Sequence, residues 1–491
     1  MKYISASFFI ILCVLMSCKQ PQVGQSIKKG PKKNQPNVLL LYMDDLRPEL
    51  GAYGSSLVKT PHIDSLASHG VTFKEAYSNV SVCGASRASM LTGIRPTRTQ
   101  FLNYNTFVEK ETPNAISLPL LFKQNGYTTI SNGKIYHHLD DNDTDFDEVY
   151  RPYAFDNNDK NLAPTDYWQS LWKDYQNPEN RIEYKQTNTG PAYESAEVED
   201  SVYIDGLMTE KVIRDIKKLK NSKQPFFLTA GFISPHLPFN APKKYWDMYP
   251  RASIKLPNNN IIPKHAPALS ISNWPEMRAY SGIPKSGPVS DSLAKTLIHG
   301  YYATVSYTDA LIGNIVSALK AEQLYDNTII ILVSDHGYNL SEHTQWAKFT
   351  THKISSQVPL IISAPNYREN VSSSALVELV DVYPTLTDLC QLKNPVNQLE
   401  GESLVSHFTS SNATGKEVLF LKNGNGYGLK TKEFGYTEFI HPKTKALLAR
   451  TLYDHSKDPE ETINVAELPE YASTVFQLHQ TLHSKFKANL E

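Results

Sequence analysis

An unbroken apolar run at 38–43 constrains the fold of this 491-residue chain more than any other stretch. Such a run predicts a strand that is buried on both faces, as in a parallel sheet. Further strands are predicted at 127–131, 225–232, 328–333 and 359–362. Helices are predicted between them, at 61–70, 115–126, 207–220 and 291–322. This alternation of strands and helices predicts an α/β fold.

The pattern changes after about residue 410. Short segments at 417–422, 435–439 and 446–453 suit an antiparallel sheet with turns, and a helix is predicted at 466–487. We therefore expect a large α/β domain over 36–410 and a smaller α+β subdomain over 411–491. Residues 139–200 and 241–290 show little periodicity and are predicted to form long loops.

The first 17 residues have the features of an export signal. Lys2 precedes an apolar core at 8–16 that is too short to span a bilayer. The core ends in Leu15-Met16-Ser17-Cys18, which is typical of a bacterial lipobox and predicts lipidation of Cys18. Residues 18–35 are polar and predict a flexible tether. We expect an exported lipoprotein of a Gram-negative bacterium, anchored in the membrane by lipid and either periplasmic or on the cell surface; the alternative is an ordinary signal peptide.

Composition narrows the function classes. A formal net charge of −1 argues against bulk nucleic-acid binding. Of the four cysteines, Cys13 lies in the predicted export signal and Cys18 is the predicted lipidation site. The folded part of the chain is therefore expected to contain only Cys83 and Cys390. Two widely separated cysteines form no disulfide framework. A free thiol in an oxidising compartment is oxidised unless it is buried or chemically modified. This makes Cys83 a candidate functional residue.

Polar clusters follow several of the predicted strands. The carboxyl ends of parallel strands meet at one sheet edge, where open α/β sheets bind ligands. Adjacent acids there repel one another unless a cation lies between them. Oxygen ligands from Asp44, Asp45 and Asp335 suit Ca²⁺ or Mg²⁺, while His336 is either a further ligand or a neighbour of the ligands. The alternative is that the two adjacent aspartates lie in a solvated loop and bind no cation. Cations that could hold a multiply charged oxyanion are Arg87, Lys134, Lys348 and the histidines His137 and His236.

The stretch from Cys83 to Gly93 joins a β-branched run to a predicted helix. A helix N-terminus favours negative charge, and Ser86 or a neighbouring residue is expected to cap it. Arg87 adds a fixed cation with donors suited to an oxyanion. A nucleophile at position 83 would thus face an anion-binding pocket. The alternative is a buried structural cysteine.

The sequence Cys83-Gly84-Ala85-Ser86-Arg87, followed by Leu91-Thr92-Gly93, resembles the signature of type I sulfatases. The resemblance covers nearly all of the chain after residue 35 and is strongest to the iduronate-2-sulfatase branch. It extends to five further segments, Asp44–Gly54, Gly133–His137, Pro235–Phe239, Ser334–Lys348 and Leu452–Asn464.

The resemblance implies an alkaline-phosphatase-like α/β/α sandwich with a large mixed, mostly parallel sheet. It also implies that Cys83 is oxidised to formylglycine (3-oxoalanine) by a formylglycine-generating or an anaerobic sulfatase-maturing enzyme. One Ca²⁺ would then be held by residue 83 with Asp44, Asp45, Asp335 and His336. Arg87 and Lys134 would stabilise residue 83 and sulfate charge, His137 would act as a base, and His236 and Lys348 would contact sulfate and protonate the leaving oxygen.

The activity implied is hydrolysis of sulfuric esters on oligosaccharides from polysaccharides such as ulvan, carrageenan or glycosaminoglycan. Two alternatives stay open: a phosphonate or phosphodiester hydrolase of the same superfamily, and a non-catalytic glycan-binding lipoprotein. Many sulfatases have Asn at the place of His336 and a different lysine–histidine spacing, so His138 competes with His137. Aromatic residues that could stack on sugars or belong to a satellite core are Tyr167, Trp168, Trp172 and Trp274.

Overall fold

The computed structural model describes residues 35–491 except 139, 153–173, 188 and 411–412. The predicted signal peptide, Cys18 and nearly all of the tether lie outside these residues, as do Tyr167, Trp168 and Trp172. No helix within the described ranges is both long and apolar enough to cross a membrane.

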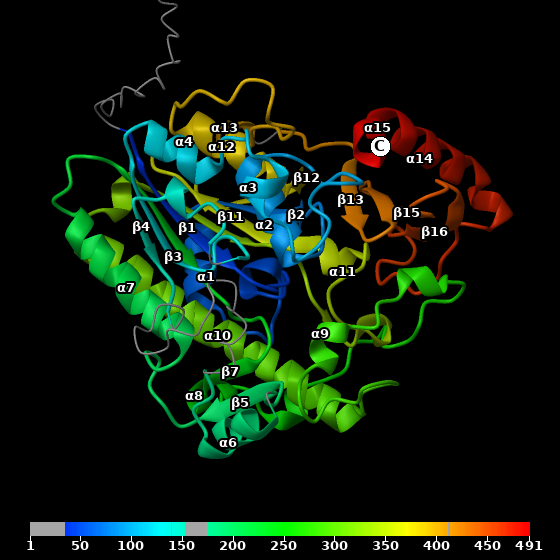
Figure 1. The fold of residues 1–491 in the computed structure, drawn as a ribbon, viewed down its shortest axis with the longest axis horizontal. Coiled ribbons are helices and arrows are strands. Elements are labelled where there is room, and N and C mark those ends of the chain that lie inside the picture. The colour runs from blue at the N-terminus through cyan, green and yellow to red at the C-terminus, as the bar shows by residue number, and fades with distance from the viewer. Residues whose placement is uncertain (1–34, 139, 153–173, 188, 411–412) are drawn as a thin grey trace, which may run out of the picture.

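An eight-stranded sheet forms the centre of the molecule, in the order β12-β2-β11-β8-β1-β6-β3-β4 (Figure 1). Its strands are β1 (Asn37–Met43), β2 (Val71–Tyr77), β3 (Thr128–Gly133), β4 (Glu148–Tyr150), β6 (Phe226–Gly231), β8 (Thr328–Ser334), β11 (Gln357–Ser363) and β12 (Val371–Glu378). Strand β1 runs parallel to both β6 and β8, whereas β11 is antiparallel to its neighbours β2 and β8. The sheet is therefore mixed and mostly parallel, as the sequence predicts.

Helices cover both faces of the sheet (Figure 1). Successive residues of β1 show why both faces are apolar: Leu39, Leu41 and Met43 belong to one buried cluster, and Val38, Leu40 and Tyr42 to the other. The first face is covered by α1 (Pro61–Ser68), α7 (Ile204–Leu219) and α10 (Asp291–Ala321), the second by α2 (Cys83–Thr92), α4 (Leu118–Gln124) and α12 (Val382–Leu389). The result is the expected α/β/α sandwich.

The C-terminal part forms a separate antiparallel sheet at the right of Figure 1. Its strands, in spatial order, are β13 (Leu419–Asn423), β14 (Gly426–Lys430), β15 (Phe434–Ile440) and β16 (Leu447–Asp454). Helix α14 (Ala472–Lys485) packs on this sheet through Val475, Leu478 and Leu482, and the short α15 (Lys487–Leu490) follows it.

Several elements were not predicted from the sequence. The supposed loop at 139–200 contains α6 (Pro178–Thr187) and β5 (Tyr193–Ala196), and β5 pairs with β7 (Phe239–Pro242). Helix α6 buries none of its residues, so its sequence lacks the apolar periodicity from which a helix is predicted. The segment at 241–290 contains the short helices α8 (Lys243–Trp246) and α9 (Pro275–Arg278). Further short helices and strands are α3 (Val108–Glu111), β9 (Asn339–Leu340), β10 (Trp346–Ala347), α11 (Lys353–Ser356) and α13 (Ser406–Thr409).

A buried carboxylate at the end of β12 joins the two parts of the chain. Glu378 binds Arg95 and Lys416 and accepts a hydrogen bond from the backbone N–H of Phe420 on β13. Burial alone would raise the pKa of Glu378, but Lys416 and Arg95 lower it from its usual 4.5 to about 2. Because the pKa is depressed in the folded state, this stabilisation is present above about pH 4.5 and is lost as the pH falls toward 2.

Replacing Glu378 by glutamine is expected to remove this acid sensitivity. Relative to Glu378→Gln, the free energy of unfolding of the wild type should fall by about 2 kcal/mol between about pH 6 and pH 3, as measured by urea unfolding. Glu433→Gln, at an exposed acid of the C-terminal subdomain, serves as the control and should follow the wild type. Equal acid dependence of wild type and Glu378→Gln would contradict the assignment.

Candidate active site

Four neighbouring parallel strands deliver the predicted site residues to one sheet edge. Strands β8, β1, β6 and β3 lie side by side and run in the same direction. Asp44 and Asp45 directly follow β1, Asp335 and His336 follow β8, and Lys134 follows β3. His236 lies shortly after β6 and Lys348 directly after β10, and all seven side chains are buried.

Cys83 is the first residue of α2 and is only 2% exposed. The expectation that Ser86 caps this helix is wrong: Val82 is the N-cap residue and supplies no side-chain bond. Ser86 instead donates its hydroxyl to the backbone carbonyl of Asp335, which ties α2 to the end of β8. The position of Gly84 requires glycine, because a Cβ there would lie 2.7 Å from the carbonyl oxygen of Tyr104.

Arg87 holds the ends of three strands together. Its Nε lies 2.9 Å from Oδ2 of Asp335, and its other nitrogens donate to the carbonyls of Met43, Lys134 and Ile135. The guanidinium also lies over the ring of Tyr42, 4.3 Å from its centroid. Burial opposes the charge, but Asp335 and Asp44 raise the pKa of Arg87, which keeps it a cation. Arg87 is thus bonded mainly to the framework of the site.

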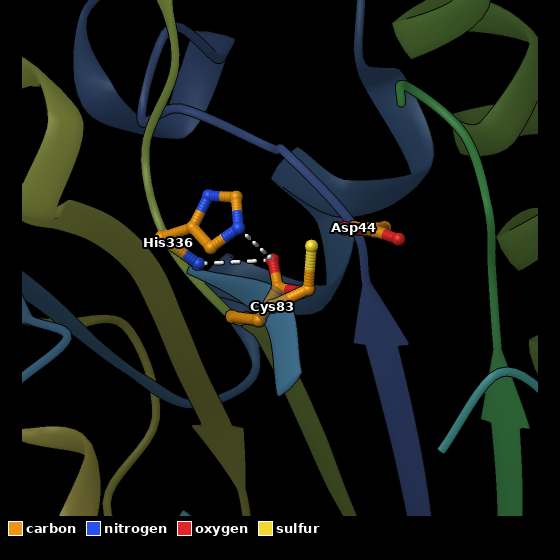
Figure 2. Close-up of side chains that lie close together, drawn as sticks. Asp44, Cys83 and His336 are labelled. Carbon is orange, nitrogen blue, oxygen red and sulfur yellow. Dashed lines mark hydrogen bonds and ion pairs between the residues drawn. The ribbon is translucent and has the colours of Figure 1, made fainter. Parts of the chain in front are cut away.

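Four side chains form a group with the spacing of metal ligands. Ligand atoms of Asp44, Cys83, Asp335 and His336 all lie within 4.8 Å of one another. Figure 2 shows the sulfur of Cys83 next to Asp44, with the His336 ring on the other side. Asp44 and Asp45 form a second such group with His236. The backbone of Asp45 is left-handed (φ 64°), an uncommon conformation for a residue other than glycine.

The donors of this group fit a cation. Oδ1 of Asp44 is buried and has no hydrogen-bond partner among the described residues, and the same holds for Nε2 of His336. Nδ1 of His336 lies 3.0 Å from the carbonyl of Gly337, which can only accept, so this contact places the proton on Nδ1 and leaves a lone pair on Nε2. Oδ1 of Asp44 and Nε2 of His336 are therefore available to coordinate a metal ion, with Asp335 and Cys83 in the same group.

Cationic side chains surround the carboxylates. Nζ of Lys134 binds Asp44, and Nζ of Lys348 lies 3.0 Å from Oδ1 of Asp45. Burial opposes ionisation of Asp44, yet Lys134, His236 and Arg87 hold its pKa well below the usual range. For Asp45, burial outweighs Lys348 and His236, and its pKa is raised. Two adjacent aspartates thus experience different environments.

Glu276 is a member of the site that was not predicted from the sequence. It lies on α9, and its two oxygens are 2.7 Å from Nε2 of His236 and 2.7 Å from Nζ of Lys348. Both partners are about 1% exposed, whereas the Glu276 side chain is 15% exposed, so it lies at the outer side of the pair. The sequence gives no signal for this role, because α9 is a single turn inside a Pro-rich segment without periodicity.

The structure distinguishes the two candidate histidines after β3. His138 stacks on the ring of Phe107, with ring centroids 3.7 Å apart. This packing makes His138 the weaker candidate for the catalytic base. His137 is 6% exposed, and burial followed by Lys134 lowers its pKa well below the usual value. His137 is therefore the better candidate for a neutral base. Trp274 is buried under the Arg278 guanidinium, so it packs in the core and presents no open face to a sugar.

The mixed, mostly parallel sheet between two layers of helices, with acidic residues directly after its parallel strands, defines the alkaline-phosphatase-like fold class. Within that class, this chain belongs to the sulfatase family: the model described as Sulfatase matches residues 36–392. A second model, N-sulphoglucosamine sulphohydrolase, C-terminal, matches residues 341–488. The chain is accordingly a sulfatase.

Individual relatives and solved structures are similar to this chain, as expected for a member of the sulfatase family. Iduronate 2-sulfatase of Homo sapiens is 33% identical over 79% of this chain and 76% of its own length. A sulfatase of Formosa agariphila is 31% identical over 97% of this chain and 91% of its own length. The fold resembles that of the phosphonate monoester hydrolase of Agrobacterium radiobacter, with TM-score 0.74 and 23% identity over 93% and 96% of the two chains. It also resembles a protein solved in complex with its substrate D-glucosamine-2-N,6-O-disulfate, with TM-score 0.69 and 21% identity over 93% and 98%.

Proposed function

We propose that this sulfatase removes sulfate from a sulfated carbohydrate, using a formylglycine derived from Cys83 and one bound Ca²⁺. The observation that carries the proposal is the position of Cys83 among three buried metal-ligand side chains. A thiol at this position is a poor nucleophile, since burial raises the pKa of Cys83 and only the thiolate attacks. A modified residue 83 removes this difficulty.

Asp44, Asp45, Asp335 and His336 would hold the calcium ion together with residue 83. A bound Ca²⁺ would supply Lewis-acid charge to the sulfate oxygens and to residue 83. One hydroxyl of the hydrated aldehyde at residue 83 would attack sulfur as the bond from sulfur to the sugar oxygen breaks; loss of the proton from the other hydroxyl would then re-form the aldehyde and break the carbon–oxygen bond to sulfate. Lys134 neutralises Asp44 and orients it. His137, kept neutral by its surroundings, accepts the proton of residue 83 at the release step.

His236 and Lys348 lie beside Asp45 and have hydrogens to donate. Nζ of Lys348 is 3.0 Å from Asp45, and Nε2 of His236 is 3.8 Å from it, so both side chains border the cluster. We assign them to the sulfate oxygens and to protonation of the leaving sugar oxygen. Glu276 is a positioning residue, because it binds both side chains at once.

The substrate class rests on the relatives. One relative is an iduronate 2-sulfatase, and a protein of the same fold binds a sulfated glucosamine as its substrate. We therefore propose a sulfated oligosaccharide, of glycosaminoglycan or algal type, that is bound by its end or as a short fragment. A formylglycine-generating or anaerobic sulfatase-maturing enzyme would modify Cys83. A lipid on Cys18 would anchor the protein in the membrane, periplasmic or at the cell surface.

Two assays test the proposal. Full-length protein from a host with the maturation system is incubated with defined sulfated oligosaccharides, and released sulfate is measured. It is also compared on matched aryl sulfate and aryl phosphate esters. We expect sulfate release with at least one oligosaccharide and a preference for the sulfate ester. Much faster turnover of the phosphate ester would assign the chain to phosphonate or phosphodiester hydrolysis instead.

Replacing Glu276 by glutamine is expected to lower kcat/KM by about 10–100-fold, equivalent to about 1–3 kcal/mol. The reason is that His236 and Lys348 lose the charged acceptor that fixes both of them. The loss should fall mainly on kcat if the two side chains act in the transition state. Asp247→Asn, at an exposed acid of the same segment, should retain wild-type kinetics. Unchanged kcat/KM in Glu276→Gln would remove Glu276 from the site.

A further inference from the structure

A second cluster of ligand-type side chains lies outside the catalytic cluster. His343, His352 and Glu461 are 1%, 3% and 3% exposed, and their ligand atoms lie within 4.8 Å of one another. His343 and His352 flank Lys348 in the sequence, whereas Glu461 follows β16 in the C-terminal subdomain. The cluster therefore joins the segment that carries Lys348 to the C-terminal subdomain.

The hydrogen bonds around His343 leave a buried lone pair. Its Nε2 lies 3.0 Å from the carbonyl oxygen of Glu460, which only accepts, and 3.4 Å from the amide nitrogen of Asn259, which only donates. The shorter contact assigns the proton to Nε2. Nδ1 of His343 is buried and finds no hydrogen-bond partner in the part of the chain that the structure describes. A buried imidazole nitrogen without a partner is unfavourable unless another group completes it.

The other two side chains are also suited to ligation. The hydrogen bonds of the His352 imidazole to described residues are long, 3.4 Å to the amide of Gln345 and 3.3 Å to the hydroxyl of Tyr453. The oxygens of Glu461 accept hydrogen bonds from His455 at 2.9 Å and from the backbone N–H of Lys353 at 3.0 Å. Each oxygen keeps a second lone pair, and such outer contacts orient a ligating carboxylate.

The backbone and the space around the cluster are also unusual. His343 and Glu461 are both left-handed, with φ of 53° and 55°. Side chains other than glycine hold this conformation at a cost, and it is found often at functional sites. A cavity of about 400 Å³ reaches His343 and Glu461 and gives an ion and its water a way in.

We propose that His343, His352 and Glu461 bind one divalent ion of the zinc class, with a water molecule from the cavity completing the coordination. Two imidazoles and one carboxylate are a donor set that suits Zn²⁺, whereas Ca²⁺ prefers oxygen ligands. The ion fastens the Lys348 segment to the C-terminal subdomain. This site is separate from the catalytic cluster and does not depend on the modification of Cys83.

A third group, Glu438 with His479 and His483, provides a matched control. It has the same residue types, but its imidazoles are 41% exposed and each one bonds a different oxygen of Glu438, at 2.6 Å and 2.8 Å. Each imidazole thus bonds Glu438 with one nitrogen and is open to solvent, so this group has no buried imidazole nitrogen that needs an ion. Substitution of His483 should therefore leave tight metal binding intact.

The test uses full-length protein that has been stripped with a chelator, filled with excess Ca²⁺ and titrated with Co²⁺ as a spectroscopic probe. We expect one tightly bound Co²⁺ with the visible absorption of a four- or five-coordinate site. The band should be lost in His352→Gln and retained in His483→Asn. No tight Co²⁺ binding, or a band that His483→Asn abolishes, would overturn the proposal.

Anomalous scattering from a Zn²⁺-soaked crystal of the wild-type protein decides the question even if His352→Gln does not fold. A peak between His343, His352 and Glu461 is expected. A peak at the catalytic cluster alone would overturn this proposal while leaving the proposed function intact. Conversely, a protein that shows the expected peak but releases no sulfate would refute the proposed function alone.

Discussion

Replacing Cys83 by alanine is expected to reduce sulfate ester hydrolysis by roughly 10⁴-fold or more, the scale of loss when an enzyme's nucleophile is removed. Alanine has no sulfur to oxidise, and its methyl group offers neither a nucleophile nor a metal ligand. Cys83→Ser is expected to lose activity wherever the maturation system accepts only cysteine. Activity is followed by released sulfate, and the state of residue 83 by mass spectrometry of its peptide.

The second described cysteine supplies the control. Cys390 is buried at the end of α12, in the core of the large domain, and lies outside both metal-ligand groups at the strand ends. Cys390→Ala should retain activity. Full activity in Cys83→Ala would overturn the enzyme mechanism. An intact thiol in all wild-type material from a competent host would favour the glycan-binding alternative.

Replacing Arg87 by methionine is expected to lower the free energy of unfolding by about 3–5 kcal/mol, the usual cost of removing one partner of a buried ion pair. Methionine fills part of the volume but leaves Asp335 without its 2.9 Å partner and removes the hydrogen bonds that Arg87 donates to three backbone carbonyls. Activity should fall in the same variant because Asp335 loses its orientation. Urea unfolding and released sulfate measure the two effects.

Arg214→Met is the control for this experiment. Arg214 is 60% exposed and its nearest acid, Glu210, lies 3.9 Å away, so the change should stay within about 0.5 kcal/mol. Arg87→Lys keeps a charge but cannot reach the same set of acceptors, and it should lie between wild type and Arg87→Met. Wild-type stability in Arg87→Met would show that the buried pair contributes little to the fold.

The sequence predicted the fold correctly where a local residue pattern determines the secondary-structure element. Strand β1 is apolar at every position after Asn37 because helices cover both its faces, and that pattern is visible in the sequence. The convergence of Asp44 and Asp335 follows from parallel pairing of β1 with β8, since both acids directly follow their strands. The strand pattern of the sequence therefore explains why the predicted site residues lie close together.

Elements without such a pattern were missed. Strand β12 lies at the edge of the sheet, and its first half is partly exposed, so small polar residues replace the apolar run. Glu276 was missed for another reason: its partners His236 and Lys348 are distant in the sequence, and only tertiary packing brings α9 beside them. The cap of α2 was mispredicted because the helix already begins at Cys83, so Ser86 lies inside its first turn and donates its hydroxyl to the Asp335 carbonyl, 249 residues further along the chain.

That long-range contact has a consequence for the biogenesis of the enzyme. Residue 83 is almost fully enclosed once α2 has docked against the end of β8, so a separate modifying enzyme would have no access to it afterwards. On the proposed function, oxidation of Cys83 must precede folding, and the modifying enzyme must recognise an extended segment. Docking of α2 against Asp335 would end the time available for modification. Conditions that accelerate folding relative to modification should then yield protein that is correctly folded but permanently inactive.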